Sequence, residues 1–328
     1  MINIFVTYRC NLSCSYCFAH ELRREYPVDL QEGSFRKLLQ WMKRSALPTA
    51  AFLGGEPTLH QGLAAMIEET TAAGIDVVLF TNGLFPGFLA DRLCRTVANF
   101  VVNFNDPETY SAESRSLLHA SLAHLAERRA RITFSKNFSS ENLAYDYLLE
   151  GAARYGVRSV RYDLSRPSAT GENGFVGIAA ARSLMAHVTG FVRACAARGL
   201  RTGLDCCVRL CDMSAEDRRY LEQVSMKFRG ICHPSIDIHP DLSASYCLPL
   251  RNVQVPDVTR FANSERLMQH FSAAVHATRY DEASAECRAC PDFKRFCQGG
   301  CLALQRQARH AAFPASGYAG PGVIDEPT

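Results

Sequence analysis

The sequence lacks any apolar run of the roughly 18 to 20 residues that a membrane-spanning helix needs, and it does not begin with a secretory signal. It also lacks a strong charge of one sign. Its 36 basic and 33 acidic residues give a net charge of +3, which predicts neither a nucleic-acid partner nor a membrane partner. With 328 residues, 47% of them hydrophobic, we expect a cytoplasmic globular protein with one large domain, or with one domain and a smaller one.

Cysteine, by contrast, is abundant, with 14 residues. Disulfides chiefly stabilise small secreted domains, whereas this chain is large and carries most of its cysteines in two groups. We therefore expect these cysteines to ligate metal.

The first two hundred residues alternate between short β-rich runs and longer helical runs, a pattern typical of a parallel sheet covered by helices. One helical run follows Asp29, with Glu32 three positions later in the spacing of a capping box. From about residue 204 the alternation stops and short, cysteine-rich runs begin. We expect an α/β partial (β/α)6 barrel over residues 1–203, a smaller cysteine-rich domain over 204–312 and a flexible tail over 313–328. The predicted strands are 4–7, 50–53, 77–81, 100–104, 131–135 and 157–162.

The first cysteine group directly follows the first predicted strand, with C-x3-C-x2-C spacing at Cys10, Cys14 and Cys17. Ligands bind parallel α/β folds where strands end. Three thiolates can each hold one iron of a cubane cluster and leave the fourth iron open to a small molecule. The alternative is a structural zinc site, for which His20 would have to supply the fourth ligand.

This motif, with Tyr16 before its last cysteine, resembles that of the radical S-adenosylmethionine enzymes. A second motif agrees, because Gly54, Gly55, Glu56 and Pro57 follow the second strand and are similar to the family's segment that binds the methionyl amino group. The glycines allow a close backbone approach to a ligand, and a glutamate can pair with an ammonium group. The resemblance thus implies S-adenosylmethionine and a [4Fe-4S] cluster as cofactors.

Polar residues at the ends of later strands extend the predicted cofactor site by analogy of strand position. Thr81 and Asn82 end the third strand, and we expect Asn103 or Ser135 to contact the ribose hydroxyls. Asn-Gly and Asn-Asp sequences are also ordinary turn formers, so a purely structural role stays open for these residues.

The second cysteine group has C-x2-C-x6-C-x3-C spacing at Cys287, Cys290, Cys297 and Cys301, with Cys232 and Cys247 upstream. This pattern resembles the auxiliary-cluster domain called SPASM, or its shorter Twitch relative. The resemblance implies one cluster on Cys232, Cys247 and Cys301 with an upstream cysteine, for which we choose Cys211 over Cys206 and Cys207. It implies a second cluster on the remaining cysteines of the group, which are Cys287, Cys290 and Cys297. A zinc ribbon built from the last four cysteines of the chain is the alternative.

Two features depart from the SPASM pattern. The usual final cysteine is absent, because no cysteine follows Cys301. The second cluster therefore has a non-cysteine or distant ligand, or keeps an open iron, or does not form. Anaerobic sulfatase-maturating enzymes carry an aspartate directly after the cysteine that matches Cys247, whereas this chain has Leu248. The general base is thus unassigned, with Asp163 and Asp205 as weak candidates near the barrel mouth.

The resemblance implies that a flavodoxin or ferredoxin supplies an electron, that S-adenosylmethionine is cleaved reductively, and that the resulting radical removes a substrate hydrogen atom. SPASM-bearing members mostly modify peptides and proteins, so we expect oxidation or cross-linking of a ribosomal peptide or protein. Because the chain starts at its first strand, we expect the barrel cleft or a separate recognition protein to hold that peptide. The alternatives are a Twitch-type dehydrogenase acting on a small metabolite and a non-enzymatic iron–sulfur or zinc protein that transfers electrons or serves as a scaffold.

Overall fold

The computed structural model describes residues 1–312, so the predicted flexible tail lies outside the described residues. Strands and helices alternate along the first two hundred residues, as predicted. The barrel strands are β1 (Ile2–Thr7), β2 (Thr49–Gly54), β3 (Asp76–Thr81), β4 (Val97–Asn103), β5 (Ile132–Phe138), β6 (Ser159–Leu164), β7 (Arg201–Leu204) and β8 (Ser225–Met226). The helices that follow them are α1 (Glu32–Arg44), α2 (Leu63–Ala72), α3 (Gly87–Leu93), α4 (Ala112–Glu127), α5 (Asp146–Tyr155), α6 (Ala181–Ala197) and α7 (Ala215–Val224).

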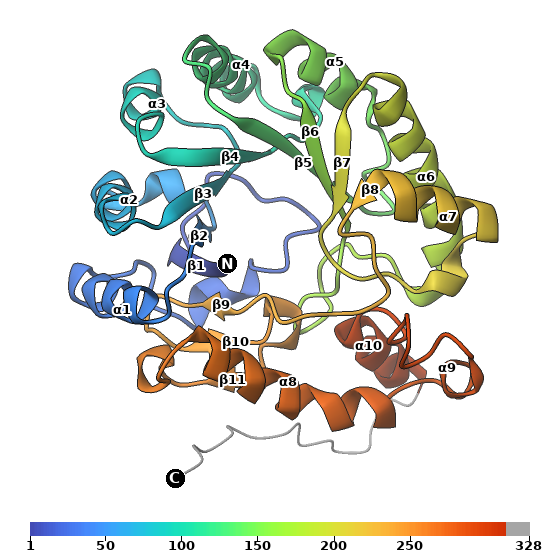
Figure 1. The fold of residues 1–328 in the computed structure, drawn as a ribbon. Coiled ribbons are helices and arrows are strands. Elements are labelled where there is room, and N and C mark those ends of the chain that lie inside the picture. Colours follow the sequence, from blue (N-terminus) through green and yellow to red (C-terminus); the bar gives the residue numbers. More distant parts are fainter. Residues whose placement is uncertain (313–328) are drawn as a thin grey trace.

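The strands form one open sheet in the order β11-β10-β9-β1-β2-β3-β4-β5-β6-β7-β8. Every pair from β9 and β1 through β8 is parallel, so the carboxyl ends of these strands meet at one edge. Figure 1 shows the strands as an arc with α1 to α7 around its outside. The predicted partial α/β barrel is therefore confirmed, and its polar strand ends face one opening.

Two strands, β7 and β8, extend the barrel beyond the six that we predicted. The chain then returns to the opposite edge, where β9 (Asp237–Ile238) pairs in parallel with β1 and continues into the antiparallel strands β10 (Ala244–Ser245) and β11 (Gln254–Val255). The cysteine-rich region thus shares the barrel's sheet. Its helices are α8 (Ser264–Asp281), α9 (Ala285–Ala289) and α10 (Leu302–Ala312).

Helix α1 illustrates how the sequence directs the covering layer. Its apolar residues recur at helical spacing, and Phe35, Leu38 and Met42 are all buried. The predicted capping box is wrong, because Gln31 occupies the N-cap position without a side-chain hydrogen bond and Asp29 instead pairs with Arg9 at 2.8 Å. Within residues 1–312, no helix is both long enough and apolar enough to cross a membrane.

Candidate functional site

The first three cysteines lie in the loop that leaves the carboxyl end of β1. Backbone and amide donors approach two of the sulfurs, since Leu12 N lies 3.4 Å from Cys10 Sγ and Asn105 Nδ2 lies 3.8 Å from Cys14 Sγ. Burial raises the pKa of all three thiols, a cost that binding to a cationic metal offsets. These donors fit a group in which the thiolates carry negative charge.

The three sulfurs are spread more widely than the ligands of one ion. Within residues 1–312, the only group of three or more His, Cys, Asp or Glu whose ligand atoms all lie within 4.8 Å of one another is Asp163, Asp205 and Cys206. A single zinc holds its thiolates about 2.3 Å from the metal and needs closer sulfurs. The spread fits a cluster in which each thiolate takes a different iron.

Gly54 and Gly55 let β2 approach the backbone at the end of β1. A Cβ on Gly54 would lie 2.2 Å from Thr7 O, and one on Gly55 would lie 2.3 Å from Arg9 O. Gly55 N donates to Thr7 O at 2.8 Å, and Glu56 N donates to Arg9 O at 2.7 Å. We predicted that these glycines allow a close approach to a ligand. In the structure they allow a close approach to the backbone of Thr7 and Arg9, just before the cysteine loop.

Glu56 is completely buried and joins the ends of two strands. Its carboxylate accepts hydrogen bonds from Thr58 N at 3.1 Å, Thr58 Oγ1 at 2.7 Å, Thr81 Oγ1 at 2.8 Å and Asn82 N at 2.7 Å. Pro57 begins the short 3-10 helix Pro57–Leu59 that Glu56 caps. The observed function of this carboxylate is positional, and its pairing with a ligand ammonium stays a prediction.

Asn82 links β3 to the cysteine loop. Its Nδ2 donates to Asn11 Oδ1 at 2.6 Å, and its Oδ1 accepts from Leu84 N at 2.9 Å. Both polar atoms of this side chain therefore bond within the protein. These contacts agree with the alternative that Asn82 has a structural role in the turn after β3.

Tyr16 connects the cysteine loop to the end of β4. Its hydroxyl donates to Asn105 Oδ1 at 2.6 Å and accepts from Asn103 Nδ2 at 2.8 Å. Asn103 Oδ1 in turn accepts from Asn137 Nδ2 on β5 at 3.2 Å. These contacts bring the predicted residues Tyr16 and Asn103 together beside Cys14.

The predicted residue Ser135 lies next to a charged pair inside the barrel. Arg161 of β6 donates to Ser135 Oγ at 2.8 Å, forms an ion pair with Asp205 and stacks over the ring of Phe80 at 5.1 Å. Sequence reasoning missed Arg161, although its place two residues before Asp163 puts both side chains on the same face of β6.

The pKa values of the two candidate bases are shifted in opposite directions. Burial raises the pKa of Asp163, and the nearby charge of Arg166 only partly opposes it. Burial also acts to raise the pKa of Asp205, but the charge and hydrogen bond of Arg161 outweigh it and lower that pKa. Each carboxyl group also has an arginine partner, because Asp163 lies 3.5 Å from Arg166 and Asp205 pairs with Arg161.

In the C-terminal region, three cysteines gather around Cys232. Contact with Cys232 raises the pKa of Cys207, and burial together with the charges of Cys232 and Cys301 raises that of Cys247. The structure places Cys207 against Cys232, whereas the predicted ligand Cys211 lines a different cavity. We call this set the first cage: Cys207, Cys232, Cys247 and Cys301.

Two buried arginines border the first cage. The charges of Cys301 and Cys207 help raise the pKa of Arg166, and those of Cys232 and Cys207 help raise that of Arg279, against the opposing effect of burial. Arg166 Nε and Arg279 Nη2 are buried without a hydrogen-bond partner in the protein. Buried unpaired donors beside four thiols fit an anionic group such as an iron–sulfur cluster.

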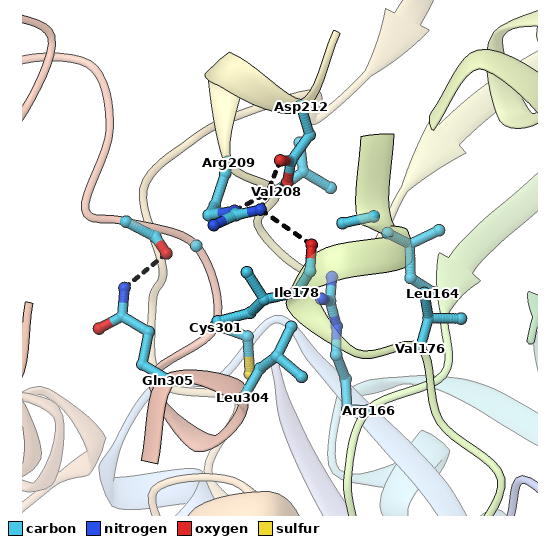
Figure 2. Close-up of a pocket in the computed structure, with 13 residues that line it drawn as sticks. Leu164, Arg166, Val176, Ile178, Val208, Arg209, Asp212, Cys301, Leu304 and Gln305 are labelled. Atoms are coloured by element: carbon cyan, nitrogen blue, oxygen red, sulfur yellow. Dashed lines mark hydrogen bonds and ion pairs between the residues drawn. The ribbon is translucent and has the colours of Figure 1, made fainter. Parts of the chain in front are cut away.

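The predicted residues Cys287, Cys290 and Cys297 line a cavity of about 220 Å³, together with Cys211. A smaller pocket of about 20 Å³, room for about one water, lies between Cys301 and the loop of Arg209. Figure 2 shows Arg209 there, directed at the carboxylate of Asp212 and the carbonyl of Ile178. The larger cavity is therefore the one with room for a cofactor.

Sequence reasoning also missed a buried carboxylate next to Leu248. Asp237 of β9 accepts hydrogen bonds from Leu248 N at 2.8 Å and from Asn3 Nδ2 at 2.6 Å. Burial raises the pKa of Asp237 to about 6. No sequence signal could have found it, because a two-residue strand brings it to β1 from far along the chain.

Comparison with known proteins agrees with this geometry. Residues 4–111 match the model of the radical SAM superfamily. The matched segment is thus similar to a radical SAM domain. It runs from β1 past the end of β4 and contains the cysteine loop, Glu56, Asn82 and Asn103.

Curated relatives match the chain over short stretches. It is 36% identical over 83 residues to an S-adenosylmethionine-dependent nucleotide dehydratase of Selenomonas ruminantium, a match that spans 25% of this chain and 29% of that protein. It is 31% identical over 97 residues to a pre-heme d1 synthase of Dinoroseobacter shibae, covering 29% of this chain and 24% of that protein. The chain thus aligns with less than a third of either relative.

Solved structures resemble the chain over nearly its whole length. Streptococcus suis SuiB bound to S-adenosylmethionine superposes with a TM-score of 0.68 at 12% identity, covering 92% of this chain and 72% of SuiB. The protein anSMEcpe with bound AdoMet and a peptide superposes with a TM-score of 0.67 at 16% identity, covering 92% of this chain and 89% of anSMEcpe. At these identities the likeness establishes the fold alone.

Proposed function

We propose that this chain is a radical SAM enzyme that removes a hydrogen atom from a ribosomal peptide or protein and so leads to its oxidation or cross-linking. The observation that carries the proposal is the loop of Cys10, Cys14 and Cys17 at the carboxyl end of β1, tied to the ends of β2, β3 and β4. Cys10, Cys14 and Cys17 would hold a [4Fe-4S] cluster, which would supply the one-electron reduction that cleaves S-adenosylmethionine. The substrate would then lose one hydrogen atom to the 5′-deoxyadenosyl group, a proton to solvent and its second electron to an auxiliary cluster.

The chain's own residues hold this arrangement in place. Glu56 and Asn82 bond the ends of β2 and β3 to each other and to the cysteine loop, and Tyr16 bonds that loop to β4. Preorganised strand ends of this kind keep a reactive cofactor at a fixed distance from the substrate. Asn103 and Ser135 offer polar groups for the ribose, and the reductant is a flavodoxin or ferredoxin.

A peptide substrate is supported by the solved structures with this fold. SuiB has been crystallised with its precursor peptide SuiA, and anSMEcpe with a peptide. Arg161 and the buried Asp163 lie on one face of β6, and we infer that these polar groups face the substrate. We place peptide recognition in the barrel cleft or in a separate recognition protein.

A small-metabolite dehydrogenase is the second candidate, and the names of the curated relatives favour it. The nucleotide dehydratase and the pre-heme d1 synthase are both named for small molecules. The two candidates differ in whether a peptide is consumed.

Incubation of the iron-loaded enzyme with S-adenosylmethionine, a reductant and short peptides encoded beside its gene tests the choice. We expect one peptide to lose two hydrogens by mass spectrometry. Cys290→Ala should spare uncoupled cofactor cleavage but stop product formation. Unchanged peptides, together with deoxyadenosine release stimulated by a small alcohol, would contradict the peptide proposal and favour the dehydrogenase.

A further inference from the structure

The cavity in the C-terminal region is lined by four cysteines from two distant parts of the chain. Cys287, Cys290 and Cys297 come from the last cysteine group, and Cys211 comes from the loop after β7. Burial, Asp212 and the charges of Cys297 and Cys287 raise the pKa of Cys211, so its sulfur lies within electrostatic reach of theirs. We call these four residues the second cage.

Specific contacts bring Cys211 to this cage. It lies in the 3-10 helix Leu210–Asp212, where Arg209 bonds to Asp212 at 2.6 Å and Arg182 of α6 donates to Cys211 O at 3.1 Å. Gly300 has a φ of +81°, and a Cβ there would lie 2.7 Å from Arg209 Cγ. The turn after Cys297 therefore packs directly against the loop that carries Cys211.

The second cage is too wide for a single metal ion. Its cavity of about 220 Å³ is many times the roughly 10–15 Å³ that one water needs, and no three of its sulfurs fall within the 4.8 Å that a single-ion site requires. Gly299 has a φ of +75°, and a Cβ there would lie 3.3 Å from Cys287 Sγ. A multi-iron cluster fits this space, whereas a zinc ribbon does not.

The other candidates for a fourth ligand are engaged elsewhere or chemically less suitable. Cys301 lies with Cys232 and Cys247 in the first cage. Asp292 lines the cavity but pairs with Arg218 at 2.6 Å. Glu286 also lines it but offers only a hard carboxylate, whereas iron–sulfur clusters take thiolates.

We propose that Cys211 is the fourth ligand of an auxiliary [4Fe-4S] cluster in the second cage and replaces the cysteine that the sequence lacks after Cys301. Cys207 then completes the first cage, so that two upstream cysteines four positions apart serve different clusters. This assignment rests on the proposed iron–sulfur chemistry of the chain but not on any substrate, and its test does not depend on turnover.

Iron counts in a background without the first cysteine loop test the proposal. In the Cys10→Ala, Cys14→Ala, Cys17→Ala triple variant, reconstituted anaerobically, all remaining iron belongs to the two cages. We expect about eight irons per chain. Adding Cys211→Ala should lower this to about four, or leave a three-iron cluster visible by electron paramagnetic resonance. Adding Cys94→Ala, a control cysteine at the end of α3, should leave about eight.

A second measurement uses the unmutated protein and therefore does not depend on the variants folding. Cys211 is exposed, so iodoacetamide should alkylate it in the metal-free chain and not in the iron-loaded chain. Protection at Cys211, Cys287 and Cys290 together supports the proposal. Alkylation of Cys211 in the iron-loaded chain while Cys287 and Cys290 stay protected would overturn it, as would zinc in place of iron in this cage.

These outcomes are distinct from failure of the proposed function. A chain that holds both auxiliary clusters but never releases 5′-deoxyadenosine would refute the enzyme and leave the Cys211 assignment intact. A chain that cleaves S-adenosylmethionine but holds only about eight irons, with Cys211 alkylated, would support the enzyme and refute the Cys211 assignment.

Discussion

The backbone N–H of Asn82 donates a hydrogen bond of 2.7 Å to Glu56 Oε2, which fastens the end of β3 to the end of β2. Thr81 Oγ1 reaches the other carboxylate oxygen at 2.8 Å. Because Asn82 also bonds to Asn11, this one buried carboxylate determines where the cysteine loop lies relative to two strands. The glutamate of the Gly-Gly-Glu-Pro segment thus contributes to the cofactor site from within the protein.

Replacing Glu56 by alanine should destabilise the protein strongly. The change leaves the donors of Thr58, Thr81 and Asn82 without their acceptor, and each buried unsatisfied donor costs about 1–3 kcal/mol. We expect a loss of at least about 3 kcal/mol in the free energy of unfolding, measured by urea titration under argon. Glu68→Ala is the control, because Glu68 is half exposed and paired only with Arg92, and it should cost less than about 1 kcal/mol. Equal losses in the two variants would contradict the role of Glu56.

A methyl group at Gly55 should displace the cysteine loop. Its Cβ would lie 2.3 Å from Arg9 O, next to Cys10, and the opposing atoms are backbone that cannot move aside cheaply. Gly55→Ala should therefore lower the iron content by about four irons per chain. Gly190→Ala in α6 is the control, since nothing lies within 4 Å of a Cβ there and helix propensity improves by up to about 1 kcal/mol. Full iron content in Gly55→Ala would show that the loop tolerates the shift.

Lys136 should make stability depend on pH. Its side chain is fully buried on β5, where its ammonium donates to Tyr147 OH at 3.0 Å, and burial lowers its pKa to about 7 from 10.5. Between pH 7 and 10 the unfolded chain holds this proton and the folded chain does not, so the lysine's contribution to stability rises with pH. Below pH 7 the folded chain must bury the charge.

The variant Lys136→Met removes that contribution. The free energy of unfolding of the unmutated protein, relative to the variant, should rise by up to about 1.4 kcal/mol per pH unit between about pH 7.5 and 9.5. The exposed Lys37 of α1 supplies the control, and Lys37→Met should leave the pH dependence unchanged. Parallel pH curves for the unmutated protein and Lys136→Met would mean that the pKa of Lys136 is not lowered.

The sequence predicted the elements whose signals are local. The helical run after Asp29 is α1, and its apolar residues recur at helical spacing. Strand β7 was missed because its four residues include a glycine and carry little apolar pattern. Strands β8 to β11 have two residues each, and only pairing with distant strands defines them.

The difference between local signals and long-range packing also explains which parts of the candidate site could be predicted. The spacing of Cys10, Cys14 and Cys17 is local and predicted their shared loop. The choice between Cys207 and Cys211 is not local, because it depends on how the loop after β7 packs against Gly300 and Arg279. Spacing alone cannot tell which of two cysteines four positions apart reaches which cage.

The account's central claim is that the first cysteine loop supports reductive cleavage of S-adenosylmethionine. The most direct test is 5′-deoxyadenosine release by the anaerobically reconstituted, chemically reduced protein, measured by liquid chromatography and mass spectrometry. Cys14→Ala should abolish release, and Cys94→Ala, which alters a cysteine at the end of α3 that belongs to none of the three proposed cysteine sets, should retain it. A fully reconstituted protein that releases no 5′-deoxyadenosine, or a Cys14→Ala variant that releases as much as the unmutated chain, would contradict the account.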